Sequence, residues 1–475
     1  MLISAPKVKR ASAAQTERAL VDLHRALGPS KVEEGSEACA RFAGDESEAE
    51  RVMPDAVVHA MDANDIVATL EVAERHGVPV TPRAGGTGRT GGAIPVAGGI
   101  VLDTSTLSKV KDIDRKNFVA VVEPGLVTGR LHALCEAEGL FYPPDPNSLE
   151  SCMIGGNVAE NAGGPRAFKY GVTRDYVLGI EACLIGGTRF FAGKRTVKGV
   201  VGYDMTALLV GSEGTLAVFS ELTLKLVKKP AHIVTLLALF SDVAACADAV
   251  SHIMDEGFVP RCMELMDGPT LRAMRGQGVA IDPRAEAMLL IELDDRDGDV
   301  VLEPLGNLLL GKSRALDVQV AQDESRRAAL WSARRALSPV TRKIAKYKLS
   351  EDIVVPRSRI SELLLRVDEH CAKESVQHLT YGHAGDGNLH VNYLWNDPSE
   401  RGAVDRAITA LMHEVVSLGG TISGEHGIGI TKMEYIGIEQ PAPLIALQRE
   451  VKRVFDPKEL LNPGKMFPTA SHGQC

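Results

Sequence analysis

Apolar and polar residues follow two different periods along this chain, and these periods predict an alternation of strands and helices. Val57-Val58 is a short apolar run that predicts a buried strand. The next segment places apolar residues at helical spacing, at Ile66, Val67, Leu70 and Ala73. Asn64 is predicted to cap this helix and Gly77 to end it. The pattern then returns to a strand at residues 78–80.

The same alternation continues along the chain. We expect a strand at 119–122, then a helix that opens at Thr128, carries Leu131, Leu134 and Cys135, and ends at Gly139. Further strands are predicted at 233–239 and 288–293, an amphipathic helix at 17–27, and a helical tail from about Thr431. Mixed strands and helices of this kind predict an α+β fold.

Glycine is unevenly distributed, and its distribution predicts the domain boundary. It is crowded into residues 85–99, 155–171 and 186–214, then becomes sparse between about 215 and 380. We therefore place a boundary near Lys229-Pro230 and expect three parts, 35–229, 230–430 and 431–475. A chain of 475 residues is too long for one ordinary hydrophobic core.

Composition narrows the class of protein. Hydrophobic residues make up 45% and charged residues 24%, which is typical of a soluble globular enzyme. The net charge of -9 argues against nucleic acid as a partner. We find no run of eighteen apolar residues and no secretory signal at the N-terminus. None of the eight cysteines forms a CxxC pair, which excludes the usual iron–sulfur cradle and favours a cytoplasmic protein with reduced thiols.

Three glycine-rich loops suggest a large ligand. The first, PRAGGTGRTGG at 82–92, follows a predicted strand, and its glycines let backbone N–H groups converge on an anion such as a diphosphate. A set of tight turns is the structural alternative. The loop is neither a GxGxxG dinucleotide motif nor a Walker loop. Two further loops, at 154–171 and 202–216, favour a flat ligand with several parts over three unrelated turns.

Two histidine motifs carry the strongest chemistry. AGDGN separates His383 from His390 and is turn-forming, so the two histidines should face each other across a hairpin mouth. The second motif contains Glu425 and His426. Two histidines and a carboxylate suit a divalent metal with an open coordination position, zinc first, with manganese and iron as alternatives. Hydrogen bonding within a loop is the structural alternative for the histidines.

A carboxylate anchor is expected on a predicted helix. Arg334 and Ser338 would share one helical face at i,i+4 spacing. A guanidinium can hold a carboxylate through two hydrogen bonds, which fixes the orientation of the neighbouring carbon. The alternative for Arg334 is a surface arginine.

These motifs together resemble a known family. PRAGGTGRTGGA, PPDP, IGGNVAENAGGPRAFKYGVTRDYV and GYDMTALLVGSEGTLA are similar to the FAD-binding domain of the vanillyl-alcohol-oxidase (PCMH-type) flavoproteins. Within them, the chain resembles the group of the glycolate oxidase flavin subunit, D-lactate dehydrogenase and D-2-hydroxyglutarate dehydrogenase. The resemblance implies a two-subdomain PCMH-type FAD-binding domain at 35–229, a ferredoxin-like α+β substrate (cap) domain with the metal site at 230–430, and a helical segment at 431–475 that packs back on the FAD domain.

The resemblance also implies which residues contact FAD. No histidine lies at 83–92, where some relatives attach the flavin, so we expect non-covalent FAD. Lys465 in the tail is expected to return to the flavin. The implied FAD contacts are Pro82, Arg83, Ala84, Gly85, Gly86, Thr87, Gly88, Gly91, Pro144, Asp145, Ser151, Gly155, Asn157, Asn161, Gly163, Gly164, Glu213, Gly214, Asn462 and Lys465.

Catalytic roles carry over in the same way. The resemblance implies that His383, His390 and Glu425 bind the metal, that His426 is the base, and that Arg334 holds the substrate carboxylate. Ser338, Lys348 and Asn392 would line the pocket, with Lys346 as an alternative to Lys348. Relatives that bind D-2-hydroxyglutarate have threonine where Ser338 falls, which argues against a dicarboxylate substrate.

The expected activity is FAD-dependent oxidation of a D-2-hydroxy acid, of the D-lactate, glycolate or D-2-hydroxyglutarate class, to the 2-oxo acid. Electrons would pass to a separate acceptor, namely a quinone, a cytochrome, an electron-transfer flavoprotein or a partner subunit. We expect a cytoplasmic protein, either a homodimer or peripheral to the membrane through a partner. The alternatives are an oxidase of the same fold that uses O₂, a non-catalytic flavin subunit of an electron-transfer complex, and a zinc hydrolase.

Overall fold

The computed structural model describes residues 3–294, 298–321, 323–335 and 337–468. The chain divides into two units, each of which is assembled from separate stretches of sequence. The two-sheet unit contains Leu2–Ala162, Val172–Lys229 and Glu425–Cys475, and the seven-stranded unit contains Gly163–Gly171 and Pro230–Gly424. The chain therefore leaves the seven-stranded unit between Gly424 and Glu425, inside the second histidine motif.

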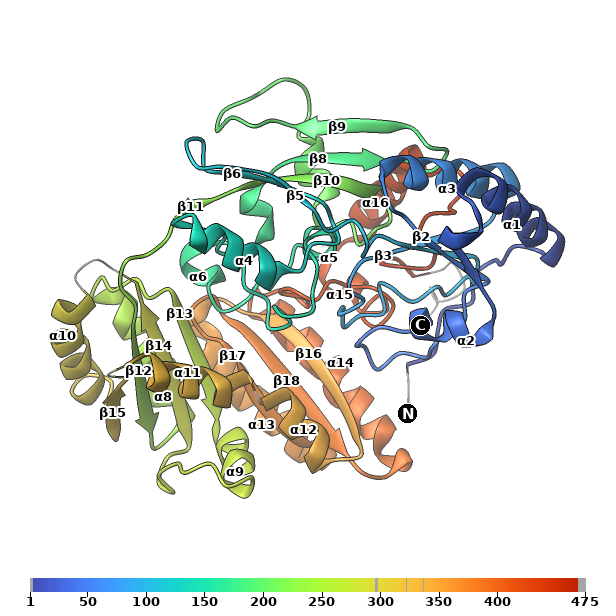
Figure 1. The fold of residues 1–475 in the computed structure, drawn as a ribbon. Coiled ribbons are helices and arrows are strands. Elements are labelled where there is room, and N and C mark those ends of the chain that lie inside the picture. The colour runs from blue at the N-terminus through green and yellow to red at the C-terminus, as the bar shows by residue number, and fades with distance from the viewer. Residues whose placement is uncertain (1–2, 295–297, 322, 336, 469–475) are drawn as a thin grey trace. The chain divides into compact units, whose positions relative to one another are not determined.

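The two-sheet unit is built on two main sheets (Figure 1). In the first, three parallel strands are joined by one antiparallel edge strand, in the order β1 (Val32–Glu34), β2 (Ala56–His59), β4 (Ile100–Asp103), β3 (Val80–Arg83). The second is antiparallel, in the order β5 (Val110–Asp114), β6 (Val119–Val122), β10 (Val218–Lys225), β8 (Val177–Cys183), β9 (Arg189–Gly193). A short pair, β7 (Leu140–Phe141) and β11 (Val227–Lys228), completes the strands.

Helices of this unit support the sheets, and one corrects a prediction. The described helices are α1 (Ala13–Leu27), α2 (Ser36–Cys39), α3 (Ala63–His76), α4 (Thr128–Ala137), α5 (Ile154–Glu160), α7 (Met205–Leu209), α15 (Ile436–Glu439) and α16 (Ala442–Phe455). The N-cap of α3 is Asp62, not Asn64, because the Asp62 carboxylate accepts the backbone N–H groups of Asn64 and Asp65. Gly77 ends α3 in the left-handed conformation, as predicted.

The tail returns to the first sheet of the same unit. After α16, Leu461 forms a parallel bridge with Val80, and the N–H of Asn462 donates to the carbonyl of Val80 at 2.7 Å. Leu460 and Leu461 lie in the same core cluster as Val58, Leu70 and Leu102. The tail thus pairs with the first residue of β3, the strand that leads into the first glycine-rich loop.

The seven-stranded unit holds one antiparallel sheet. Its strand order is β15 (Asp317–Val320), β12 (Val234–Phe240), β14 (Ala287–Leu293), β13 (Cys262–Asp267), β17 (Gln377–His383), β18 (Asn388–Trp395), β16 (Tyr347–Val354). With α8 (Val243–Asp255) and α10 (Gly298–Leu310), strands β12 to β15 form a βαββαβ unit in the ferredoxin-like spatial order, as predicted. Strands β16 to β18 extend this sheet.

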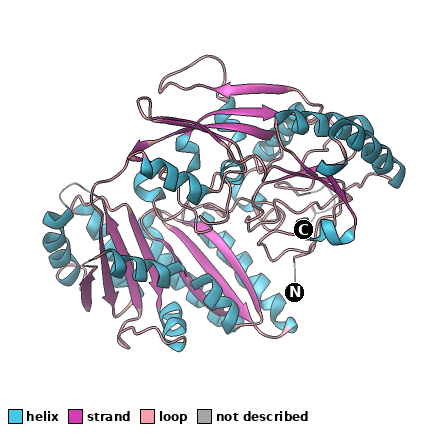
Figure 2. Cartoon of the chain, in the orientation of Figure 1, coloured by secondary structure: helices cyan, strands magenta, loops and turns pink. Residues whose placement is uncertain are grey.

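Helices cover both faces of the seven-stranded sheet, and Figure 2 shows helices and strands in both units. They include α6 (Ala167–Tyr170), α9 (Gly268–Gly276), α11 (Glu324–Arg335), α12 (Leu337–Ile344), α13 (Ile360–Glu374) and α14 (Arg401–Ser417). Under α9 and α11, an apolar cluster includes Leu239, Met266 and Leu290 of the sheet and Leu271 of α9. Arg334 lies in α11, which ends at Arg335, and Ser338 lies in α12, which begins at Leu337; residue 336 lies outside the described residues, so the shared helical face stays a prediction.

Two further features bear on the sequence predictions. No helix among the described residues is long and apolar enough to cross a bilayer. Seven cysteines are buried and form no disulfide with one another; Cys475 lies outside the described residues. Burial raises the pKa of the Cys135 thiol to about 12, which makes this thiol an inert packing group.

Candidate functional site

One face of the seven-stranded sheet carries an unusual group of buried polar side chains. Residues directly paired across an antiparallel sheet point to the same face. Glu264 pairs with His383, Tyr381 with His390, and His390 with Asp352, so these side chains lie together. The register adds Asn392, Ser350 and Lys348 to the same face. A polar group of this size inside an apolar sheet indicates a functional site.

The two histidines occupy the ends of a tight hairpin. His383 is the last residue of β17, and His390 is the third residue of β18. Their ring centroids lie 5.4 Å apart with an interplanar angle of 89°, and both rings are buried. Gly387 permits this turn, because its φ is +84° and an added Cβ would lie 1.9 Å from the carbonyl oxygen of Val355.

Glu264 links His383 to the arginine of α11. Its Oε1 lies 2.5 Å from Nδ1 of His383, and its Oε2 lies 2.6 Å from Nη2 of Arg334. Burial opposes ionisation of Glu264, but its interactions with His383 and Arg334 outweigh burial and hold the pKa of the carboxyl below its ordinary value. The three groups form a buried, charge-assisted chain.

Arg334 is buried rather than exposed, which removes the surface alternative. Its side chain is 4% exposed, and its guanidinium carbon lies 4.8 Å from the centroid of the Tyr381 ring. Among the described residues, its Nε has no hydrogen-bond acceptor. A buried guanidinium with an unsatisfied donor is suited to an incoming anion.

Asp352 secures His390 and the segment that leads to Glu425. The Asp352 carboxylate accepts the side-chain amide of Asn388 at 2.6 Å and the backbone N–H of Gly424 at 2.9 Å, and it lies 3.8 Å from Nδ1 of His390. An added Cβ on Gly424 would lie 2.5 Å from the Asn388 amide nitrogen. Gly424 is thus held against the histidine hairpin, and Glu425 is the next residue of the chain.

The remaining predicted pocket residues have mixed positions. Lys348 is buried in β16, on the face that carries His390. The Asn392 amide donates to the carbonyls of Leu379 and His390, so it also braces the hairpin. Lys346 precedes β16 and is exposed. The side chain of Ser338 lies outside the part of the chain that the structure describes.

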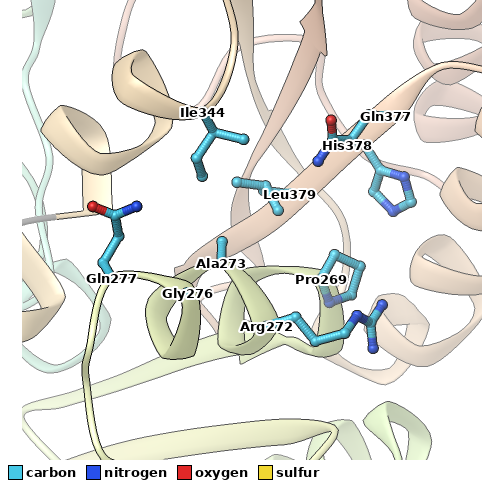
Figure 3. A pocket seen from close by; sticks show the side chains of 9 residues that line it. All are labelled: Pro269, Arg272, Ala273, Gly276, Gln277, Ile344, Gln377, His378 and Leu379. Carbon is cyan, nitrogen blue, oxygen red and sulfur yellow. The ribbon is translucent and has the colours of Figure 1, made fainter.

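A separate cavity of about 470 Å³ opens at the other end of β17 (Figure 3). Leu379, Ala273 and Ile344 give it an apolar floor, and Arg272 and His378 add charge. Strand β17 begins at Gln377 and ends at His383, which places the two ends roughly 20 Å apart at the usual rise per residue. The cavity is therefore distinct from the histidine hairpin.

In the two-sheet unit, the first glycine-rich loop follows β3 directly, as predicted. Residues Pro82 to Arg89 are partly buried. The N–H groups of Gly85, Gly86, Thr87 and Gly88 donate to no described protein atom. Gly85 also allows close packing, because an added Cβ would lie 2.9 Å from the carbonyl of Ser151. A run of unsatisfied backbone donors is a suitable cradle for a diphosphate, so FAD fits this loop.

Several predicted FAD residues have structural contacts as well. The Arg83 guanidinium donates to the carbonyl of Gly44 at 2.7 Å, and the Asn157 amide donates to the Thr128 hydroxyl at 2.7 Å. Asn161 ends α5 in the left-handed conformation. The other predicted residues are distributed over this unit as follows: Ala84 and Gly91 in the first loop, Pro144, Asp145 and Ser151 in the segment before α5, Gly155 in α5, and Gly214 before β10. Gly163 and Gly164 belong to the seven-stranded unit.

Glu213 has a role that the sequence did not indicate. Its carboxylate oxygens accept the backbone N–H groups of Ile428 at 2.8 Å and Gly429 at 2.7 Å. The Thr90 hydroxyl donates to the carbonyl of His426 at 3.1 Å. These contacts hold the loop that carries Glu425 and His426, whose side chains lie 3.8 Å apart.

The predicted tail residues lie close to this loop anchor. The Asn462 amide donates to the carbonyls of Gly92 and Glu213, and the Lys465 ammonium donates to the carbonyl of Ile94 at 2.5 Å. Burial lowers the pKa of Lys465 to about 7, although nearby carboxylates oppose this shift. Burial also raises the pKa of Glu160 well above its ordinary value, and the charge of Glu213 adds to this shift.

The sequence predictions missed Glu264, Asp352 and Thr90. Glu264 lies in the strand CMELMD, in which every residue is buried. Asp352 lies in the strand YKLSEDIV and is fully buried. An acidic residue inside an otherwise apolar strand was the available signal, because buried charges are rarely tolerated without a partner. Thr90 gave no such signal.

Comparison with known proteins gives a consistent result. Residues 229–466 match the family model of FAD linked oxidases, C-terminal domain, and residues 54–192 match that of the FAD binding domain. The chain is 37% identical over 449 residues to the glycolate oxidase subunit GlcD of Bacillus subtilis, covering 93% of this chain and 94% of that protein. It is 31% identical to the D-lactate dehydrogenase of Anaerostipes hadrus, covering 94% and 97%.

Solved structures show the same fold. A crystal structure of p-cresol methylhydroxylase with substrate bound superposes with a TM-score of 0.81 over 97% of this chain and 98% of that one, at 14% identity. An alkyldihydroxyacetonephosphate synthase gives a TM-score of 0.75 over 96% and 87%, at 17% identity. At these identities the likeness establishes the α+β fold of PCMH-type FAD-binding proteins, as predicted from the sequence.

Proposed function

This chain belongs to the FAD-linked oxidases, and from that premise we propose that it oxidises a D-2-hydroxy acid to the corresponding 2-oxo acid. Glycolate and D-lactate are the substrate classes that the names of its relatives suggest. The observation that carries the proposal is the buried Arg334 guanidinium beside the His383–His390 pair. That combination can bind a carboxylate and a neighbouring hydroxyl at the same time.

FAD would be held non-covalently. The N–H groups of loop 84–88 would bind its diphosphate, and the other predicted contact residues would surround the rest of the molecule. The bound flavin supplies the hydride acceptor, while the protein orients it and excludes competing reactions.

Arg334 would bind the substrate carboxylate. Glu264 already holds one edge of its guanidinium, which leaves the Nε donor for the ligand. Stacking over Tyr381 limits rotation of the guanidinium, so the carboxylate would be held in a defined orientation. Lys348, Asn392 and Ser338 are proposed to line the same pocket.

A divalent metal would be held by His383, His390 and Glu425. The two imidazoles are buried, and Gly424, the residue before Glu425, is held beside their hairpin. Two imidazole nitrogens and one carboxylate form a donor set that suits zinc, with manganese and iron as alternatives. The metal would lower the pKa of the substrate hydroxyl and so make its ionisation feasible near neutral pH.

His426 is the proposed base. An imidazole can accept the hydroxyl proton near neutral pH, and general-base help of this kind contributes about 10²–10⁴-fold to a rate. Glu213 and Thr90 hold the backbone around His426. A fixed backbone limits the positions of the imidazole, so less entropy is lost when it takes up its reactive position.

Electrons would leave the flavin for a separate acceptor: a quinone, a cytochrome, an electron-transfer flavoprotein or a partner subunit. The Bacillus subtilis relative is named a glycolate oxidase subunit, which favours a partner protein. We propose a cytoplasmic enzyme, either a homodimer or peripheral to the membrane through that partner.

Steady-state turnover tests this function. The purified holoprotein is assayed with an artificial dye acceptor and matched D and L forms of 2-hydroxy acids, and peroxide is measured in air. We expect turnover with a D-acid and little peroxide. Peroxide formed in proportion to turnover would instead support an oxidase. Failure of every 2-hydroxy acid with a flavin-loaded protein would contradict the proposal.

A further inference from the structure

Glu264 is fully buried in the middle of a sheet, yet it has two ionisable partners. Its two oxygens lie 2.5 Å from Nδ1 of His383 and 2.6 Å from Nη2 of Arg334. A fully buried carboxylate is costly unless its partners compensate it. The neighbouring residues of the strand, Leu265 and Met266, are apolar and equally buried. An apolar residue at position 264 would avoid the cost of burying a charge, so the carboxylate indicates a specific role.

The short contact with His383 determines the tautomer of that histidine. Arg334 contacts the other oxygen of Glu264, which places this carboxylate as an acceptor, and Nδ1 of His383 then carries the hydrogen of their contact. The lone pair of the neutral ring then lies on Nε2, which becomes the nitrogen that can bind a metal. A histidine ligand that donates its other N–H to a carboxylate is better oriented and more basic than one that does not.

The contact with Arg334 acts on the other end of the substrate. One Glu264 oxygen holds Nη2, and the Tyr381 ring lies against the guanidinium. The same carboxylate thus fixes both a metal ligand and the carboxylate anchor. Because a 2-hydroxy acid carries its hydroxyl and its carboxylate on neighbouring carbons, the two binding groups must keep a fixed spacing.

We propose that Glu264 is a positioning residue with two effects. It directs the Nε2 lone pair of His383 toward the metal, and it holds Arg334 at the distance from His383 that a 2-hydroxy acid requires. This inference rests on the proposed function and extends it to Glu264, which acts through His383 and Arg334.

The sheet offers a matched control. Glu292 lies on the same face, one strand away, paired with Cys262 of β13. It is also buried. It accepts from Thr235 and from Trp331 of α11, it lies 3.3 Å from Nε of the buried Arg261, and it contacts neither His383 nor Arg334 in the described contacts. Glu292→Gln therefore makes the same chemical change in the same sheet, at a carboxylate that contacts neither His383 nor Arg334 directly.

The experiment compares metal affinity in the flavin-loaded protein. Wild type, Glu264→Gln, Glu264→Asp and Glu292→Gln are depleted of metal and titrated with Zn²⁺ and with Mn²⁺ against a competing chelator, and flavin content is recorded for each. We expect Glu264→Gln to bind metal about 10–100-fold more weakly than wild type. Its KM for the 2-hydroxy acid should also rise, whereas the metal affinity of Glu292→Gln should match wild type within about twofold.

Each outcome decides the question. Wild-type metal affinity in Glu264→Gln, or an equal loss in Glu292→Gln, would overturn the proposal. If Glu264→Gln loses its flavin, Glu264→Asp decides, because it keeps the charge but shortens the reach: weaker metal binding at full flavin content supports the proposal, and unchanged binding overturns it. If the metal results hold but no 2-hydroxy acid is oxidised, the positioning role stands and the proposed function fails. Absence of metal binding in wild type would overturn both.

Discussion

The loop that carries His426 rests on one buried carboxylate, and its removal should slow flavin reduction without removing the flavin. Glu213 accepts two backbone N–H groups, from Ile428 at 2.8 Å and from Gly429 at 2.7 Å. In Glu213→Gln, one oxygen becomes an NH₂ group that faces one of these donors. The variant therefore loses one charge-assisted hydrogen bond and leaves one buried N–H without an acceptor.

The magnitude follows from that single lost bond. A hydrogen bond to a charged group contributes about 1.5–3 kcal/mol. Burial raises the pKa of Glu213, while the two N–H groups oppose this, so removing the charge also relieves a desolvation cost. We therefore take the lower half of the range, about 1.5–2 kcal/mol, which corresponds to roughly 10–30-fold in the rate of flavin reduction.

The assay is anaerobic stopped-flow reduction of the bound flavin by the best 2-hydroxy acid. The control is Glu221→Gln on β10, which removes an exposed ion pair with Lys111 and should leave the rate unchanged. A Glu213→Gln rate within twofold of wild type, at full flavin content, would refute the reasoning. Loss of flavin from Glu213→Gln alone would show that Glu213 serves the cofactor instead of the loop.

Three further outcomes are expected. Burial raises the pKa of Glu160, so the folded state binds its proton more tightly, and this stabilisation is present below the unfolded pKa and is lost as the pH rises. Glu160→Gln should therefore gain stability relative to wild type as the pH rises above the ordinary glutamate pKa of about 4.5, which denaturant titrations would measure. Burial opposes protonation of His378, but its hydrogen bond to Asp368 and the nearby Cys371 and Asp267 outweigh burial and raise its pKa to about 10. The protonated His378 should therefore stabilise the folded state fully below about pH 6.5, and this stabilisation should be lost by about pH 10. His378→Gln should therefore approach wild-type stability as the pH rises, and a constant difference would contradict this. Gly387→Ala should lower the thermal midpoint of unfolding and weaken metal binding together. The added Cβ would meet the Val355 carbonyl, and the positive φ costs a non-glycine residue roughly 1–2 kcal/mol. An unchanged midpoint would contradict this.

Turn residues and apolar periodicity were sufficient to predict the histidine hairpin and the glycine-rich loop, because both depend on residues close together in the sequence. The AGDGN turn predicted that His383 and His390 would lie close together; in the hairpin His383 pairs with Asn388 and His390 with Tyr381, so the histidines are diagonal neighbours on one face. The glycine-rich loop after β3 was predicted from its dense glycines directly after an apolar strand. The cap of α3 was misassigned because Asp62 and Asn64 are both good capping residues, and sequence alone does not show where the first turn begins.

Long-range partnerships could not be predicted. Glu264 is 119 residues from His383 in sequence, so its partner is determined by the neighbouring positions of β13 and β17 in the sheet. Glu213 is 215 residues from Ile428. Such contacts depend on topology, which no local period encodes.

The measurement that tests the central claim most directly is anaerobic bleaching of the flavin absorption by a panel of D- and L-2-hydroxy acids, repeated after chelation and with His426→Ala. The account predicts rapid bleaching by at least one D-acid, with strong slowing after chelation and in the variant, and recovery on returning Zn²⁺ or Mn²⁺ to the chelated protein. A flavin-loaded protein that no 2-hydroxy acid bleaches, or that is bleached equally fast without metal and without His426, would contradict it.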